Sequence, residues 1–255
     1  MNSKIKLITQ NALQNERRIT MKKRKQPSDP AKEFENTFNY LRSKYGSHSV
    51  WEDFLTVSAI SIANAFDFRQ DREDLWHQTV KKYADEDVQK FAALFAMMVI
   101  ELEREPKQDF LGQMATHLGV NNKHIGQCFT PYHVAELMAK CSIAAKNKLP
   151  FQTVNDPTCG YGVMLIAARN AMLDAGKNIH LDLFCVAQDI SFSAAMGCYI
   201  QMSLLGIAGY VRVGDTLANP GVGNALIADE QSWCTPMYFS PEWEIRRMLS
   251  AVSKG

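Results

Sequence analysis

Apolar residues recur at a helical spacing through the first half of the chain and predict a series of helices. The first covers residues 30–46 and is introduced by Ser28-Asp29-Pro30, which offers a capping side chain and a proline at the first helical position. Residues 87–104 are apolar around much of the helical circumference, so this segment is expected to be the central helix of a bundle. Two more helices are predicted over residues 49–66 and 75–83, on either side of a charged break at 67–74.

The pattern changes after residue 126, where short apolar runs begin to alternate with helical segments. Residues 151–155, 181–188 and 210–213 are predicted as strands, and the second is nearly all apolar, as a strand buried on both faces should be. Strands and helices that alternate at this length predict an α/β fold with a doubly wound parallel sheet. The accompanying helices are predicted over residues 131–145, up to about 176, and 191–205.

Each of the three predicted strands leads to an aspartate: Asp156, Asp189 and Asp215. Ligands of open parallel sheets bind beyond the carboxyl ends of the strands, so these carboxylates are expected to face one cleft. An acid at each strand tip suits a ligand that spreads an amine, a ribose and a base across that cleft. Taken singly, each aspartate is more often a turn or cap residue.

The first aspartate opens the run Asp156-Pro-Thr-Cys-Gly-Tyr-Gly162, which leads from a strand into a helix. Glycines let the backbone approach a ligand closely, and the free N–H groups of a helix N-terminus favour a negative group. The run differs from the Gly-x-Gly-x-x-Gly phosphate loop, because Val163-Met164-Leu165 follows the second glycine. Considered alone, this stretch is equally well explained as an ordinary strand-to-helix turn.

The net charge of +1 conceals a strongly basic N-terminus. Residues 1–27 contain eight Lys and Arg and a single acid, a charge of +7, which leaves −6 for the rest of the chain. An acidic body is poorly suited to holding a phosphate backbone by itself. The arm is either a DNA contact or a solvated, disordered extension, and a translation start at Met21 would remove most of it.

The six cysteines show no Cys-x-x-Cys pair and no grouping with the six histidines that would suit a metal, so no metal is expected. They are typical of reduced thiols in a cytoplasmic protein. The longest apolar run, residues 91–100, is about half of what a membrane span requires, and no apolar stretch follows the basic N-terminus to form a signal peptide. The sequence therefore predicts a cytoplasmic globular protein.

Four motifs follow one another along the second half of the chain: Gly126-Gln-Cys-Phe-Thr-Pro-Tyr-His-Val-Ala-Glu-Leu-Met138, the run 156–162, Ala187-Gln-Asp-Ile-Ser191 and Gly214-Asp-Thr-Leu217. Together they resemble the adenine-N6 DNA methyltransferase family, in particular the methylation subunits of type I restriction–modification systems. The resemblance covers residues 110–217, and the helical region before it is also typical of that branch. It implies a Rossmann-like, S-adenosylmethionine-dependent methyltransferase fold and methyl transfer to adenine N6 in DNA.

The same resemblance implies roles for particular residues in binding S-adenosylmethionine. Asp156 and the backbone around the two glycines would hold the amino-acid part, Asp189 the ribose hydroxyls, and Asp215 the adenine amino group. The Phe-Thr-Pro loop would close over the methionine end. The implied cofactor site consists of Gln127, Phe129, Thr130, Pro131, Asp156, Pro157, Thr158, Gly160, Gly162, Asp189 and Asp215.

The catalytic motif of the family, Asn/Asp-Pro-Pro-Tyr/Phe at the end of a fourth strand, has no direct counterpart. Asn219-Pro220-Gly221 follows Asp215 too closely for a strand to intervene. Thr235-Pro236-Met237-Tyr238 lies at a suitable distance, but it has a hydroxyl in place of the amide or acid and Met in place of the second proline. The candidates for catalysis are therefore Thr235, Pro236 and Tyr238.

These observations divide the chain into a basic arm (1–27), a helical domain (28–125), a methyltransferase-like domain (126–240) and a C-terminal tail (241–255). The sheet is expected to be truncated, with Val211 on an edge that a partner chain would cover. Three functions stay open: a DNA methyltransferase that acts with a specificity or other subunit, a non-catalytic S-adenosylmethionine-binding subunit, and a structural remnant whose aspartates only cap helices.

Overall fold

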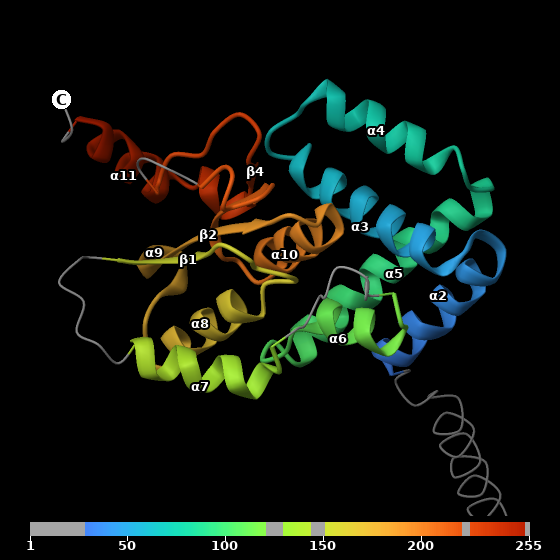
Figure 1. The fold of residues 1–255 in the computed structure, drawn as a ribbon, viewed down its shortest axis with the longest axis horizontal. Coiled ribbons are helices and arrows are strands. Elements are labelled where there is room, and N and C mark those ends of the chain that lie inside the picture. Colours follow the sequence, from blue (N-terminus) through green and yellow to red (C-terminus); the bar gives the residue numbers. More distant parts are fainter. Residues whose placement is uncertain (1–28, 121–129, 144–150, 221–224, 253–255) are drawn as a thin grey trace, which may run out of the picture.

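A computed structural model of the protein describes residues 29–120, 130–143, 151–220 and 225–252, and places a group of helices beside a small sheet (Figure 1). Three of the helices predicted for the first half are present: α2 (Pro30–Tyr45), α3 (Ser47–Ala63) and α5 (Asp85–Arg104). The carboxylate of Asp29 accepts a hydrogen bond from Ala31 N at 3.2 Å, so the capping role predicted from Ser28-Asp29-Pro30 is confirmed.

Two helices differ from the prediction. Helix α4 (Gln70–Val80) begins inside the expected charged break, because Asp71 and Glu73 are favourable in a first helical turn, where the helix dipole attracts negative charge. Helix α6 (Phe110–His117) was not predicted from its short pattern. It is capped by the Asp109 carboxylate, which accepts from Gly112 N at 2.9 Å.

The central helix is α3 and not α5, so that prediction was wrong. Helix α5 is amphipathic, with Phe91 and Leu94 buried while Ile100 is 46% exposed. Helix α3 is buried along most of its length, because α2 and α4 pack on it from one side and a helix of the sheet layer packs on it from the other. A helix enclosed by two layers has no solvent face to keep polar.

The sheet has the order β1-β2-β3-β4, and its first three strands are parallel, which confirms the α/β fold with a parallel sheet. Helices α8 and α10 connect the parallel strands, α7 packs on α8, and the short α9 precedes β2 (Figure 1). The elements are α7 (Tyr132–Ile143), β1 (Gln152–Asp156), α8 (Val163–Asp174), α9 (Ile179–Asp182), β2 (Leu183–Asp189), α10 (Phe192–Leu204), β3 (Ala208–Val213) and β4 (Trp233–Cys234).

Both faces of β2 are buried, as its apolar sequence predicted. Leu183, Cys185 and Ala187 belong to the large core that contains α8 and α10. Phe184 points to the opposite face, where it packs with Trp243. This second face is covered by the 3-10 turn η2 (Pro236–Phe239) and by α11 (Pro241–Val252), so the segment expected as a tail forms a helix anchored by a buried tryptophan.

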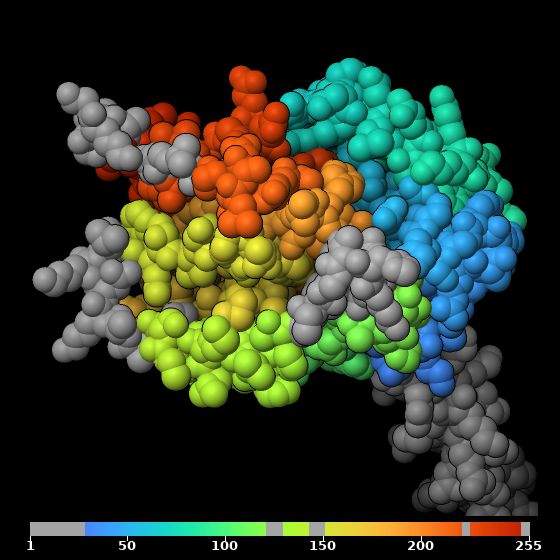
Figure 2. Space-filling view, viewed as in Figure 1, coloured from blue at the N-terminus to red at the C-terminus, as the bar shows by residue number. Residues whose placement is uncertain are grey.

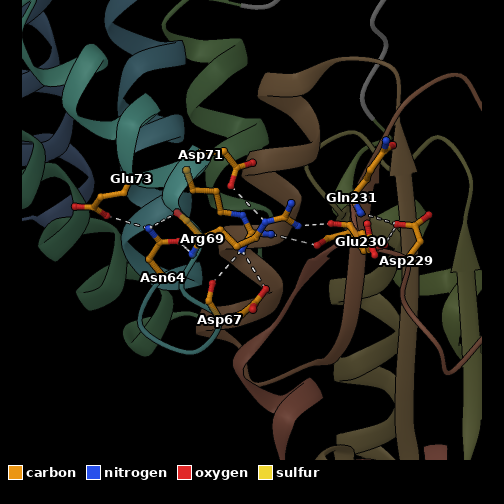
Figure 3. A network of polar contacts seen from close by, with 10 residues as sticks. Asn64, Asp67, Arg69, Asp71, Glu73, Asp229, Glu230 and Gln231 are labelled. Carbon is orange, nitrogen blue, oxygen red and sulfur yellow. Dashed lines mark hydrogen bonds and ion pairs between the residues drawn. The ribbon is translucent and has the colours of Figure 1, made fainter.

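The expected open edge at Val211 is also absent. Val211 is fully buried and pairs with Trp233 of β4, which runs antiparallel to β3. Tertiary contacts hold β4 and the residues just before it against the helical region (Figure 3). The guanidinium of Arg69 donates to the carbonyl of Glu230, and that of Arg72 donates to Ser232 O at 3.3 Å while lying 4.4 Å from the centroid of the Trp233 ring.

One hydrophobic core runs through the helical region and the face of the sheet that carries α8 and α10. It includes Phe34 and Trp51 from the first region and Leu165 and Tyr199 from the second. Phe38 and Phe54 of the helical region are also buried in this core, whereas Phe66 and Phe68 are 57% and 62% exposed. The division at residue 126 stays a prediction about sequence pattern. Within the described ranges, no helix is long and apolar enough to span a membrane.

Candidate functional site

The ends of the three parallel strands lie along one edge of the sheet. Asp156 is aligned with Ala187 of β2, and Asp189 with Val213 of β3, so the tips advance stepwise from one strand to the next. Asp215 follows two residues after β3, beyond Gly214, whose N–H donates to Asp189 O at 2.9 Å. The parallel pairing thus brings the three predicted aspartates to the same edge.

The run 156–162 forms a tight loop that the backbone of β2 holds in place; we refer to residues 159–162 as the glycine loop. Cys159 N donates to Gln188 O at 2.9 Å, and Gly160 N donates to Asp189 Oδ2 at 2.8 Å. Gly162 has a φ of 92° and precedes α8, and a Cβ there would lie 2.8 Å from Cys198 Sγ. Only glycine combines this left-handed conformation with such close packing.

Asp189 connects the glycine loop to the next helix. Its Oδ2 accepts from Gly160 N, and its Oδ1 accepts from Ser191 N at 2.8 Å, just before α10. A carboxylate offers about four lone-pair sites, so these two backbone bonds leave acceptor capacity for a ligand. The side chain is half-buried, which keeps it within reach of such a ligand.

Asp156 lies in a different environment at the tip of β1. Its Oδ1 accepts from Thr158 N at 3.2 Å, which closes a turn over Pro157. Burial raises the pKa of the Asp156 carboxyl, the nearby Asp189 charge adds to the rise, and the hydrogen bond from Thr158 opposes it. A half-buried carboxylate with a raised pKa gains from a cationic partner, because a positive charge restores its ionised form.

The loop after β3 folds towards the loop after β1. Asp215 is exposed and accepts from Leu217 N at 2.9 Å, and the hydroxyl of Thr216 donates to Pro157 O at 2.6 Å. Sequence reasoning had not assigned a role to Thr216, although it lies within the quoted Gly-Asp-Thr-Leu run. Leu217 is 96% exposed, so an apolar side chain stands beside Asp215 at the rim.

Gln188 is a second residue that sequence reasoning missed. Its side-chain amide nitrogen donates to Gly214 O and to Asn219 O, each at 3.2 Å, while its backbone carbonyl accepts from Cys159 N. It therefore positions the loops after β1 and β3 together. A polar residue at the end of an otherwise apolar strand was the available signal, because a buried amide needs partners.

The Phe-Thr-Pro loop is described only in part, since Gln127 and Phe129 lie outside the described residues. Pro131 O accepts from Val134 N and Ala135 N at 3.0 and 3.2 Å and so starts α7. Thr130 and Pro131 face α6 across a cavity of about 310 Å³, whose lining includes Asp109 and Gly112. The described part of the loop thus lies beside the helical region, and the lining of this cavity includes none of the strand-tip aspartates.

A second cavity of about 210 Å³ lies between α7 and the outer edge of β1. It is bounded by Asp156 and by apolar side chains such as Met138 and Met164. Among the described residues β1 pairs only with β2, and Thr153 and Asn155 are exposed. Figure 2 shows α7, in yellow-green, lying along the side of the molecule next to the yellow surface of β1 and α8.

The structure does not bring the catalytic candidates to this edge. Thr235 follows β4 and binds the beginning of β3: its hydroxyl donates to Ile207 O at 2.8 Å and accepts from Gly209 N at 3.2 Å. It is fully buried at the opposite end of the sheet from Asp156 and Asp189. The hydroxyl of this threonine therefore has a structural use, as a cap on a strand.

Tyr238 is buried in the core on the second face of the sheet, and Pro236 lies in the turn that leads to it. Pro236 begins η2, and the Tyr238 ring packs against Phe184 and lies 3.8 Å from the guanidinium carbon of Arg247. The catalytic assignment of Thr235, Pro236 and Tyr238 thus lacks the geometry it requires, because the short β4 runs antiparallel beside β3. In the part of the chain that the structure describes, no three His, Cys, Asp or Glu residues gather as metal ligands.

Comparison with known protein families identifies the family to which the chain belongs. The model of the N-6 DNA methylase family matches residues 109–244, which include all three strand-tip aspartates and the glycine loop. The chain belongs to the N-6 DNA methylase family. The resemblance inferred from the four motifs is therefore confirmed, and so is the methyltransferase-like fold that it implied.

Individual relatives match only over parts of their length. The chain is 32% identical over 123 residues to the type II restriction enzyme and methyltransferase RM.BcgI of Heyndrickxia coagulans, a match that covers 48% of this chain and 18% of that protein. A solved structure, the type I restriction–modification methyltransferase subunit of Streptococcus thermophilus, matches with a TM-score of 0.38 and 17% identity. That match covers 68% of this chain and 41% of the subunit. The chain thus spans about a fifth of the length of the curated relative.

Proposed function

We propose that the carboxyl edge of β1, β2 and β3 binds S-adenosylmethionine. The arrangement of Asp189 carries this proposal: it holds the glycine loop through Gly160 N at 2.8 Å and keeps lone pairs for the two ribose hydroxyls. Asp156 would pair with the amino group of the cofactor, and its raised pKa suits a cationic partner. Asp215 would accept a hydrogen bond from the adenine amino group.

The remaining parts of the proposed site follow from the same family pattern. Pro157, Thr158 and Gly162 would shape the backbone around the amino-acid part of the cofactor, and the close approach at Gly162 supports a cradle that excludes side chains. The loop residues Gln127, Phe129, Thr130 and Pro131 are proposed to close over the methionine end. These assignments rest on the order of the motifs together with the contacts at the strand tips.

The proposed reaction is methyl transfer to adenine N6 in DNA, with this chain contributing the part that binds the cofactor. Bound S-adenosylmethionine supplies an electrophilic methyl group on a sulfonium centre. The residues of this chain would hold that methyl group in line with the attacking amine, a placement that supplies much of the rate. The target adenine has to leave the base stack to reach it.

The transfer also requires a polar group that accepts the hydrogens of the amine. Thr235 lies too far from the strand tips to do this, so we propose that the acceptor comes from outside the described residues. The cavity beside Asp156 and the outer edge of β1 offers the space for it. DNA and a specificity or other subunit are the proposed partners, and the free cysteines among the described residues suit the cytoplasm.

One observation favours a second candidate function. Because the Thr235–Tyr238 segment serves the core of the sheet, the chain is also suited to be a subunit that binds S-adenosylmethionine without turnover of its own. Such a subunit would contribute the cofactor, or sense it, within a restriction–modification assembly. The two functions share one binding site and differ only in methyl transfer.

Transfer of labelled methyl from S-adenosylmethionine to unmethylated bacterial DNA tests the proposal, with calorimetric titration of the cofactor in parallel. We expect binding, and label on adenine N6 that disappears in Asp215→Ala. Binding without label would establish the non-catalytic function instead. Absence of both binding and label in the folded wild-type protein would overturn both functions and leave the strand-tip aspartates as structural caps.

A further inference from the structure

A buried hydrogen bond joins the helical region to the glycine loop. The indole N–H of Trp51, on α3, donates to the hydroxyl of Tyr161 at 2.8 Å, although 110 residues separate them in the sequence. Trp51 is 1% exposed and Tyr161 is 4% exposed. Their rings meet edge to face, with centroids 6.2 Å apart, so both the ring and the hydroxyl of Tyr161 contact the helical region.

The same tyrosine is held a second time, through its backbone. Tyr161 O accepts from the amide nitrogen of Gln201 at 2.8 Å, and this nitrogen also donates to Asp109 Oδ1 at 2.8 Å. The carbonyl of the Gln201 side chain accepts from Leu111 N at 3.2 Å. Gln201, fully buried on α10, therefore joins the glycine loop to the first turn of α6.

The packing around Tyr161 leaves it little freedom. Its ring lies over Gly197 of α10, where a Cβ would come within 2.2 Å of Tyr161 Cδ1. Burial raises the pKa of the Tyr161 hydroxyl, which therefore stays protonated and hydrogen-bonded. A side chain fixed at its hydroxyl, ring and carbonyl determines the course of the backbone on both sides of it.

The two neighbours of Tyr161 are the glycines of the proposed cofactor loop. Gly160 directs its N–H to Asp189, and Gly162 begins α8. A rotation of the backbone at Tyr161 would alter both, since they adjoin it in the chain. We infer that Trp51 and Gln201 are positioning residues: through Tyr161, the helical region sets the geometry of the glycine loop and thereby the affinity for the cofactor. The positioning of the glycine loop is independent of the proposed function, and only the effect on cofactor affinity rests on it.

The chain provides a matched control for the tryptophan. Trp243, on α11, is also fully buried and donates its indole N–H to a backbone carbonyl, His180 O, at 2.7 Å. Its hydrogen bond stabilises the second face of the sheet, away from the glycine loop. Trp51→Phe and Trp243→Phe therefore remove similar groups from similar environments, and only the first touches Tyr161.

The test measures cofactor affinity and loop protection in wild type, Trp51→Phe and Trp243→Phe. Calorimetry at a temperature well below unfolding gives the Kd for S-adenosylmethionine, and hydrogen–deuterium exchange gives the protection of the Cys159, Gly160 and Gly162 amides. We expect the Kd to rise about 5- to 20-fold in Trp51→Phe, because the hydrogen bond from Trp51 to the buried Tyr161 hydroxyl is lost, together with faster exchange in the loop. Both variants should lower Tm, and Trp243→Phe should leave Kd and loop exchange unchanged.

Each outcome decides a separate point. An unchanged Kd and unchanged loop exchange in folded Trp51→Phe would overturn the positioning role while leaving the proposed function intact. A wild-type protein that binds no cofactor would overturn the proposed function, and loop exchange would then decide the positioning role by itself. If Trp51→Phe does not fold, Tyr161→Phe removes the other partner of the same hydrogen bond and keeps the ring, and the same readings apply.

Discussion

Asp189 is the residue through which the proposed cofactor site can be tested most sharply, because its carboxylate serves the fold and the ligand at once. One oxygen accepts from Gly160 N and the other from Ser191 N, both at 2.8 Å. In Asp189→Asn one of these N–H groups would face an amide N–H₂, which cannot accept a hydrogen bond. The variant keeps the size of the side chain while it loses one acceptor and the negative charge.

The expected effects differ in size for stability and for binding. Losing one charge-assisted hydrogen bond at a half-buried site costs about 1.5 kcal/mol of unfolding free energy, at the lower end of the usual range, and lowers Tm by roughly 3–6 °C for a chain of this size. Losing the ionised acceptor of two ribose hydroxyls costs about 1.5–3 kcal/mol of binding free energy, which raises the Kd for S-adenosylmethionine roughly 10- to 150-fold.

Calorimetric titration and thermal unfolding measure the two effects on the same samples. Asp215→Asn is a matched control for stability, since Asp215 is exposed and an Asn side chain can still accept from Leu217 N. It should leave Tm within about 2 °C of wild type. The assignment of Asp189 to the ribose is refuted if folded Asp189→Asn binds S-adenosylmethionine within twofold of wild type.

Three further predictions concern groups with defined surroundings. Because burial raises the pKa of Asp156 above its ordinary 3.8, cofactor affinity should fall as the pH is lowered through that raised value; Asp156→Asn should bind weakly at neutral pH and show no such dependence in titrations between about pH 4 and 7. Burial also raises the pKa of Asp109, so the native state binds more protons than the unfolded state between the ordinary pKa of 3.8 and the raised one. The free energy of unfolding of the wild type should therefore decline as the pH rises between these two values. Urea unfolding of Asp109→Asn should not show this decline. Thr235→Val removes two strand hydrogen bonds and should lower the unfolding free energy by about 1–3 kcal/mol without changing the cofactor Kd, whereas a strong loss of binding in the folded variant would restore this residue to the site.

Much of this protein follows from local pattern. The alternation of apolar strands with helices predicted the parallel sheet, because a strand buried on both faces must be apolar throughout, as β2 is. Asp29 was identifiable as a cap from its place before Pro30, since capping depends on a few adjacent residues. The three aspartates were predicted to share an edge because parallel strands end on the same side, and the register of β1, β2 and β3 bears this out.

Other features depend on which segments meet in space, and no local pattern contains that information. An apolar stripe indicates that a helix is covered without naming what covers it, so α5 was mistaken for the central helix, a position that α3 holds between two layers. Thr235 has the spacing of a catalytic residue, yet the antiparallel pairing of β4 places its hydroxyl on Gly209 at the far end of the sheet.

The contact between Trp51 and Tyr161 is decided in the same way. Each residue taken alone is an ordinary aromatic in an apolar pattern, and only folding brings the indole of α3 to the glycine loop. The family resemblance, the sheet and the acids at its tips could all be predicted from the sequence, because they depend on local order and on strand direction. The tertiary structure decided which groups support the loop and which candidate lies away from it, because packing joins residues that are distant in the chain.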